Sequence, residues 1–138
     1  MGIRKGGAMS EQVNDRDEIT RVVQLCIDGE RKGDASKLRE AFHEDARMYG
    51  NLGDQRFDFP IEELFTMSDG HPADVDGSYR ARIISIEQVG DAAIVKVEEE
   101  GYWGSVSFTD FFSLASIKGE WKIVNKTFAH TGGEPPAG

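Results

Sequence analysis

The sequence predicts a single α+β domain in which a curved antiparallel sheet wraps around a long N-terminal helix and leaves an internal pocket. Apolar residues near the start of the chain recur at helical spacing, whereas residues 79–128 alternate apolar and polar residues between short turns that contain glycine. A sheet of long strands twists strongly and must cover its concave face. Only the N-terminal helices are available to cover it, so the two parts of the chain together predict a cone.

Composition limits what this domain can bind. The chain has 138 residues, of which 38% are hydrophobic and 30% charged, and its formal net charge is -9. We expect no nucleic-acid partner and no membrane partner, because an acidic surface repels both. No apolar run approaches the length of a membrane span. The single cysteine, Cys26, excludes an internal disulfide, and we expect a cytoplasmic protein.

The two ends of the chain differ in composition from the rest. Residues 1–13 combine basic residues with glycine and lack the apolar core of a secretory signal, so they predict a flexible leader. Residues 131–138, with the sequence TGGEPPAG, have little to pack and predict a disordered tail. A single folded domain is therefore expected over residues 14–130.

Three helices are expected ahead of the long strands. The first covers Asp15–Arg31, where a capping box precedes an apolar stripe; that stripe contains Cys26, which we expect to be buried rather than reactive. Asp34 caps a second helix over Ala35–Phe42. Pro60 suits the first position of a third helix.

Two short strands and four long strands are expected. The short strands are Ala46–Gly50 and Arg56–Phe59. A loop rich in proline, glycine and aspartate follows the third helix. Alternating hydrophobicity between glycine-containing turns then predicts four long strands: Tyr79–Val89, Ala92–Glu100, Trp103–Leu114 and Glu120–Phe128.

Asp110 is the most informative residue of the long strands. Alternate side chains of a strand point to opposite faces, and the face that carries Asp110 also carries Val106, Phe108, Phe112 and Leu114. A carboxylate on an apolar face needs a partner, a raised pKa or a function. We therefore expect Asp110 to mark a site.

The last strand predicts neighbours for this carboxylate. Simple alternation places Trp121, Ile123, Asn125 and Thr127 on one inward face, with Asn125 near Asp110. Tyr49 would add a hydroxyl group from the first strand. A few polar groups in an apolar cavity are typical of a small-molecule site. The predicted pocket is lined by Phe42, Tyr49, Phe65, Phe108, Asp110, Phe112, Trp121 and Asn125.

A structural role for Asp110 is an equal alternative. Arg80 or Arg82 could reach across the sheet, pair with Asp110 and lower its pKa. No metal site is expected, because the three histidines lie far apart in the sequence without other ligands at metal-binding spacing. No cofactor is expected either, since the chain lacks a nucleophile elbow, a phosphate-binding glycine loop and a dinucleotide fingerprint. Of Glu98, Glu99 and Glu100, at most one should point inward.

Four short motifs occur in an order that resembles a known superfamily. They are Gly33-Asp34, Phe42-His43-Glu44-Asp45-Ala46, Phe108–Leu114 and Gly119–Lys126. Their order resembles the nuclear transport factor 2-like superfamily of cystatin-like cones, and within it the "Putative lumazine-binding" and SnoaL-like polyketide cyclase families. The resemblance covers Asp17 to Phe128 and implies a cone with an internal ligand pocket.

The resemblance implies several activities. The superfamily includes ketosteroid isomerases, polyketide cyclases, epoxide hydrolases, dehydratases and transport factors. The ketosteroid isomerases use a general-base Asp, whose place is taken here by Gly50. They also use a neutral Asp as a hydrogen-bond donor, at or within one residue of Asp110. The polyketide cyclases likewise use a pocket Asp.

Three functions follow from these expectations. The first is a cone protein that binds a small hydrophobic molecule. The second is a cofactor-independent cyclase, isomerase or dehydratase in which Asp110 moves a proton while Asn125 or Tyr49 holds the oxyanion. The third is an interaction module that uses the convex sheet face. A homodimer through that face is expected, because it should expose Phe111, Val124 and Phe128.

Overall fold

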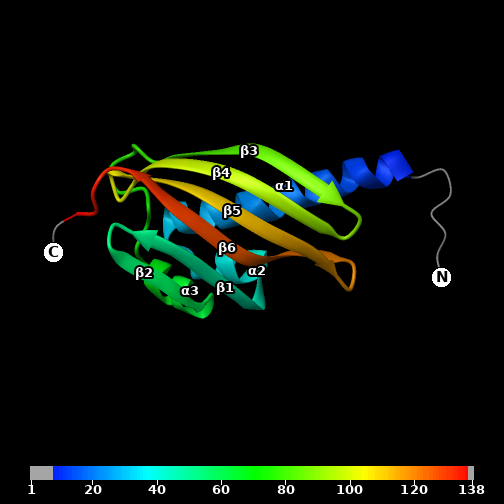
Figure 1. The fold of residues 1–138 in the computed structure, drawn as a ribbon, viewed down its shortest axis with the longest axis horizontal. Coiled ribbons are helices and arrows are strands. Elements are labelled where there is room, and N and C mark those ends of the chain that lie inside the picture. Colours follow the sequence, from blue (N-terminus) through cyan, green and yellow to red (C-terminus); the bar gives the residue numbers. More distant parts are fainter. Residues whose placement is uncertain (1–7, 137–138) are drawn as a thin grey trace.

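The computed structural model describes the backbone of residues 8–136 and the side chains from Asn14 onward. It is an α+β cone with three helices and one six-stranded sheet, as the sequence predicts (Figure 1). The sheet order is β2-β1-β6-β5-β4-β3. The elements are α1 (Ala8–Lys32), α2 (Ala35–Ala41), β1 (Phe42–Leu52), β2 (Gln55–Pro60), α3 (Glu62–Ser68), β3 (Arg80–Val89), β4 (Ala92–Tyr102), β5 (Val106–Ile117) and β6 (Glu120–Gly132).

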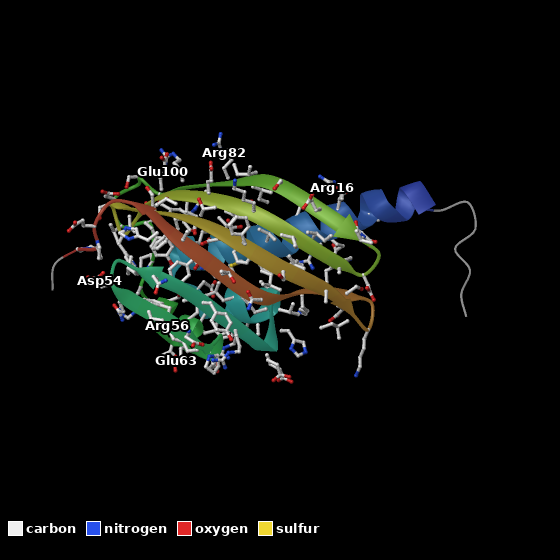
Figure 2. All side chains as sticks on the ribbon, in the orientation of Figure 1. Arg16, Asp54, Arg56, Glu63, Arg82 and Glu100 are labelled. Atoms are coloured by element: carbon white, nitrogen blue, oxygen red, sulfur yellow. The ribbon has the colours of Figure 1, made fainter. Side chains whose placement is uncertain are left out.

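The sheet is antiparallel except at one place, where β6 pairs in parallel with β1. The long strands curve, and α1 runs along their concave side, while α2 and α3 lie beside β1 and β2 (Figure 1). Charged side chains such as Arg16, Arg82 and Glu63 point outward from this cone (Figure 2). Across residues 8–136, no helix is both long and apolar enough to cross a membrane.

Several predicted boundaries differ from the structure. Pro60 ends β2 instead of opening α3, because it pairs with Arg47 and the following N–H, that of Ile61, donates to the Ala46 carbonyl at 2.9 Å. α1 already begins at Ala8, within the stretch predicted as a leader. β6 continues to Gly132, which pairs with Ser107, so the predicted tail begins too early. The predictions for residues 1–7 and 137–138 lie outside the described residues.

One face of α1 supplies much of the core. Ile19, Val23 and Cys26 are fully buried, as the predicted stripe requires. They pack with the inward residues of the sheet, where edge-to-face contacts join Phe42 to Phe112 at 6.4 Å between ring centroids, and to Phe65 at 5.9 Å. This half of the interior is filled by side chains: Phe42, Phe65, Phe112 and Trp121 belong to the core and are not among the residues that line the cavity described below.

A β-bulge in β6 changes which side chains face inward. Leu114 pairs with Ile123, but Ser113 pairs with Asn125, so Val124 is an extra residue on β6. Because side chains alternate with period two, one extra residue reverses the alternation beyond it. The inward residues after the bulge are consequently Lys126 and Phe128.

Candidate functional site

Four ionisable side chains meet inside the cone. Glu30 comes from α1, Glu99 from β4, Asp110 from β5 and Lys126 from β6, and each is at most 4% exposed. The strands β4, β5 and β6 are neighbours in the sheet, so their inward side chains converge opposite the helix. Nζ of Lys126 lies 2.6 Å from Oε1 of Glu30, which makes a buried, charge-assisted ion pair.

Glu99 and Asp110 form a second pair within the cluster. Burial raises the pKa of both carboxyl groups, and the neighbouring charge of Asp110 raises the pKa of Glu99 further. A hydrogen bond between the two carboxyls favours Glu99 as the proton holder and Asp110 as the ionised partner. The Tyr79 hydroxyl donates to Oε2 of Glu99. The two acids therefore titrate as a coupled dyad that shares one proton.

Positive charge in the cluster comes from Lys126. Burial alone would lower the pKa of this ammonium group, but the negative charges of Glu30, Asp110 and Glu99 outweigh burial and raise it well above its usual value. Burial likewise raises the pKa of Glu30, and the Lys126 charge opposes that change. We infer a Glu30–Lys126 ion pair beside a carboxyl dyad with one net negative charge.

Two tyrosines and one cysteine surround these charges. Tyr102 donates its hydroxyl proton to Oε1 of Glu30 at 3.3 Å, and burial raises the pKa of the Tyr79 and Tyr102 hydroxyls, so both remain donors. Sγ of Cys26 lies 4.0 Å from Oε2 of Glu30. Burial raises the pKa of this thiol well above its usual value, so it stays protonated and unreactive, in agreement with the prediction that Cys26 is buried.

A pocket opens from the charged cluster to the surface. It leaves about 80 Å³ for the centres of water-sized molecules, and about 580 Å³ of atom-free space when its open mouth is included. Glu30, Glu99, Asp110 and Lys126 form its floor. Its walls are apolar: Met48, Leu52, Phe57, Leu64, Phe108 and Phe128. Met67 and His71 are exposed and Trp103, Leu52 and Phe57 are half-buried, so the mouth of the pocket lies among these residues.

Outside the dyad, two oxygen atoms of the floor have no protein partner. Oε1 of Glu99 and Oδ2 of Asp110 are buried, and apart from the bond between the two carboxyls they have no hydrogen bond to any of residues 14–136. Only one hydrogen bond of the Lys126 ammonium group, to Glu30, is found within the same residues. An ammonium group has three N–H donors. The floor can thus accept a ligand that offers an acceptor to Lys126 and a proton to Asp110.

Only some of the site residues predicted from the sequence line the pocket. Asp110 lies on the pocket floor and Phe108 in its wall, as expected. Asn125 faces outward because of the bulge, and its Oδ1 accepts from the Thr127 hydroxyl at 2.8 Å. Tyr49 does not line the pocket, and its hydroxyl accepts from Nε of Arg47 at 3.1 Å. Both predictions of inward side chains were therefore wrong.

The alternative in which Arg80 or Arg82 pairs with Asp110 is not what the described residues show. Arg82 forms an exposed ion pair with Glu98 at 2.9 Å. Arg80 donates to the backbone carbonyls of Gly77 and Tyr79. Both arginines lie on the outer face, so Lys126 and Glu30 are the charged neighbours of Asp110, and Glu99 is its hydrogen-bond partner.

Three residues of the pocket floor, Glu30, Glu99 and Lys126, were not predicted from the sequence as site residues. Two had readable signals: Glu30 follows Cys26 at helical spacing on the apolar stripe, and Glu99 alternates in phase with the buried Val95 and Val97. Only Glu99 of the three successive glutamates is buried, which confirms that no more than one points inward. Lys126 had no signal, because simple alternation from Ile123 places it on the outer face.

The three carboxylates also have a spacing that could hold a cation. One oxygen each from Glu30, Glu99 and Asp110 lie within 4.8 Å of one another. The Lys126 ammonium already stands 2.6 Å from Oε1 of Glu30, one of the three carboxylates, so a metal ion would compete with it. We assign the cation role at this site to Lys126.

Comparisons with known proteins agree with this architecture. The sequence profile of the family described as "Putative lumazine-binding" matches residues 14–129. The chain belongs to this family of nuclear transport factor 2-like proteins. A nuclear transport factor 2-like protein of unknown function from Methylobacillus flagellatus is 34% identical, with a TM-score of 0.79 over 87% of this chain and 94% of that chain. A similar protein from Shewanella baltica is 29% identical, with a TM-score of 0.77 over 91% and 97%.

A third protein that is similar to this chain carries the name of an enzyme. It is called Aldolase FrzH, comes from Cladobotryum sp and is 29% identical over 112 residues, which are 81% of this chain and 88% of that protein. A ketosteroid isomerase-like protein from Erwinia carotovora is 15% identical with a TM-score of 0.66, and it supports the fold alone. The family and fold make this protein a ligand-binding cone.

Proposed function

We propose that this protein is a cofactor-independent enzyme that transfers protons on an enolisable carbonyl compound bound in the pocket. The observation that carries the proposal is the pair of buried carboxyl oxygens, on Glu99 and Asp110, that have no protein partner outside the dyad and share a pocket floor with Lys126. Burying a charge is unfavourable. A pocket that only held an apolar ligand would gain nothing from four such groups.

The floor residues have separate roles in this proposal. Asp110 is the base, because it is the ionised member of the dyad and its Oδ2 accepts no hydrogen bond from outside the dyad. Glu99 holds the shared proton, and Tyr79 fixes its position. Lys126 donates a hydrogen bond to the oxyanion that develops on the carbonyl oxygen, and Glu30 holds the ammonium in place.

An aldol-type reaction suits this arrangement, and the name of the Cladobotryum relative supports it. In the cleavage direction, Asp110 takes the hydroxyl proton of a β-hydroxyketone, and the bond between the α and β carbons breaks. The electron pair of that bond forms an enolate whose oxygen is stabilised by Lys126. The proton on Asp110 then returns to the α carbon, so an aldehyde and a ketone leave without any other reactant.

Two assays test this proposal. The first measures deuterium incorporation next to the carbonyl of acetylnaphthalene in heavy water, which reports proton transfer whatever the later reaction is. The second follows the cleavage of a fluorogenic naphthyl β-hydroxyketone to acetone and a naphthaldehyde. We expect Asp110→Asn and Lys126→Met to lower both rates by roughly 10²–10⁴-fold.

Lys122→Met is the matched control. Lys122 lies on the same strand, but its ammonium donates to the Glu40 carbonyl at the surface. This variant should retain the parent rates. Full exchange by both Asp110→Asn and Lys126→Met, or no exchange by the parent, would refute the enzyme.

A ligand carrier is the second candidate, and the apolar pocket wall favours it. Met48, Phe57, Leu64 and Phe108 can enclose a hydrophobic molecule without reaction. Equilibrium dialysis with acetylnaphthalene and with lumazine measures this function directly. Binding by the parent in the absence of any deuterium exchange would favour the carrier.

Pairing of two copies through the convex face remains a prediction. Phe111 is 44% exposed and Ile94 is 50% exposed on that side of the sheet, whereas Phe128 is buried after the bulge and adds nothing to the patch. We infer a homodimer held by this smaller patch. Light scattering at micromolar concentration should give the mass of a dimer for the parent and a lower mass for Phe111→Ser.

A further inference from the structure

We propose that Trp103 selects ligands with a flat unsaturated ring by stacking against them at the mouth of the pocket. This inference rests on the ligand pocket of the proposed function, but it does not depend on the reaction. Trp103 is partly exposed and lines the pocket mouth. Its ring meets Tyr102 edge-to-face, with centroids 4.8 Å apart and planes at 87°.

The backbone at Trp103 is unusual for a large side chain. Residues 102–105 form a tight hairpin turn between β4 and β5, closed by the Ser105 N–H to the Tyr102 carbonyl at 3.2 Å. The two central residues have φ of 54° at Trp103 and 89° at Gly104, as in a type I′ turn. That turn favours asparagine, aspartate or glycine at its first central position, because φ is positive there. A tryptophan at this position is unfavourable for the turn.

A second hairpin in the same chain provides a comparison. Lys118 and Gly119 have φ of 52° and 84° between β5 and β6. Trp103 and Lys118 are the only non-glycine residues with positive φ among residues 8–136. Lys118 is exposed and does not line the pocket. The two turns share a conformation, so their difference isolates the indole.

Contacts with a neighbouring loop hold the Trp103 turn in place. The Trp103 N–H donates to the Ala73 carbonyl at 2.8 Å. A Cβ atom on Gly104 would meet Asp76 at 3.3 Å and Val75 at 3.4 Å, so the turn is packed against that loop. A Cβ atom on Gly119 would meet nothing within 4 Å. Strain that is maintained by tertiary contacts is typical of sites where the position of a side chain serves a function.

The position of the indole indicates the ligand that it would select. Polar groups for a carbonyl head lie on the floor, and the apolar walls lead from there to Trp103, Phe57 and Met67. A flat aromatic ring can stack against the indole and contact methionine sulfur. A saturated ring of the same carbon skeleton is thicker and has no π face. We therefore assign the pocket to carbonyl compounds that carry an aromatic or conjugated ring.

Calorimetric titration with two probe ketones tests this assignment. One probe is acetylnaphthalene, and the other is the same ketone with both rings fully saturated. We expect the parent to bind the aromatic ketone about tenfold more tightly, the upper range for one aromatic contact. Trp103→Phe should retain most of this preference. Trp103→Leu keeps an apolar side chain without a flat ring and should reduce the preference to less than about twofold.

Controls separate this inference from its alternatives. Lys118→Gly relieves the same backbone conformation and should leave both affinities unchanged. Asp110→Asn should keep the aromatic preference even where proton transfer is lost, so failure of the enzyme leaves this inference standing. A parent that binds neither ketone, or shows no preference, would overturn it. So would a Trp103→Leu variant that keeps the tenfold preference while its melting temperature falls, because the indole would then serve packing alone.

Discussion

The two halves of the cone interior are built on different principles, although the same strands run through both. Before the bulge of β6, Trp121 and Ile123 pack with Leu114 and Phe42 in a filled apolar core. Beyond the bulge, Lys126 joins three carboxyl groups at the floor of a pocket. Apolar side chains can fill a space completely, whereas buried charges leave oxygens that still need partners. The second half is therefore packed less completely than the first, and its polar groups remain available to a ligand.

Truncation in the filled half should have the largest effect on stability. Leu114 is 2% exposed, so Leu114→Ala should lower the free energy of unfolding by about 2–5 kcal/mol. Ile94→Ala, on the neighbouring strand but half exposed, should lower it by no more than about 1 kcal/mol. Urea denaturation measures both. Equal losses would mean that the filled half is not the core that the contacts indicate.

Removal of the buried cation should have the next largest effect, and this effect should depend on pH. Lys126→Met leaves three buried carboxyl groups without a positive neighbour, which should cost about 3 kcal/mol near neutral pH. Protonation of the carboxyl groups relieves this cost, so the loss should shrink as the pH falls toward 4. A loss that stays constant from pH 4 to 8 would contradict the charged cluster.

Near neutral pH, Asp110→Asn should raise the free energy of unfolding, whereas Lys126→Met should lower it. The pKa of Asp110 is raised in the folded state, chiefly by burial, so the folded protein binds more protons than the unfolded chain above the unfolded pKa of about 3.9. This carboxyl group therefore contributes stability that is lost as the pH rises from that value through its folded pKa. Asn at this position removes the loss, and each unit of pKa difference corresponds to about 1.4 kcal/mol. Denaturation curves from pH 4 to 8 should show a flatter profile for the variant.

The smallest effect on stability is expected for a substitution at Asn125, which is next to Lys126 on β6. Asn125 faces outward next to the inward Lys126, so Asn125→Ala should change the free energy of unfolding by less than about 0.5 kcal/mol. It should also leave the deuterium-exchange rate unchanged. A strong loss of exchange would restore the inward position that simple alternation predicts.

The two halves also differ in how well the sequence alone predicts which side chains face inward. Helical and strand periodicity is set locally, so the α1 stripe and the inward row of β5 around Asp110 were predictable. The bulge at Val124 depends on the pairing of β6 with β5, which one strand alone does not reveal. Every residue beyond it was therefore placed on the wrong face. The prediction of the site lacked one piece of tertiary information, the position of the bulge. The bulge places Lys126, and not Asn125, on the inward face of β6.

The place of β6 in the sheet order has a consequence for folding kinetics. β6 is the last strand among residues 8–136, yet it lies between β1 and β5 and joins two parts of the sheet that are otherwise unconnected. Its pairing with β1 joins Met48 to Lys126, a contact of long sequence separation, and such contacts slow folding. During synthesis, Glu30 has no ion-pair partner until β6 has been made, after the five other strands of the sheet. The buried ion pair can therefore form only once β6 is present, and truncation within β6 should leave a chain that does not fold cooperatively.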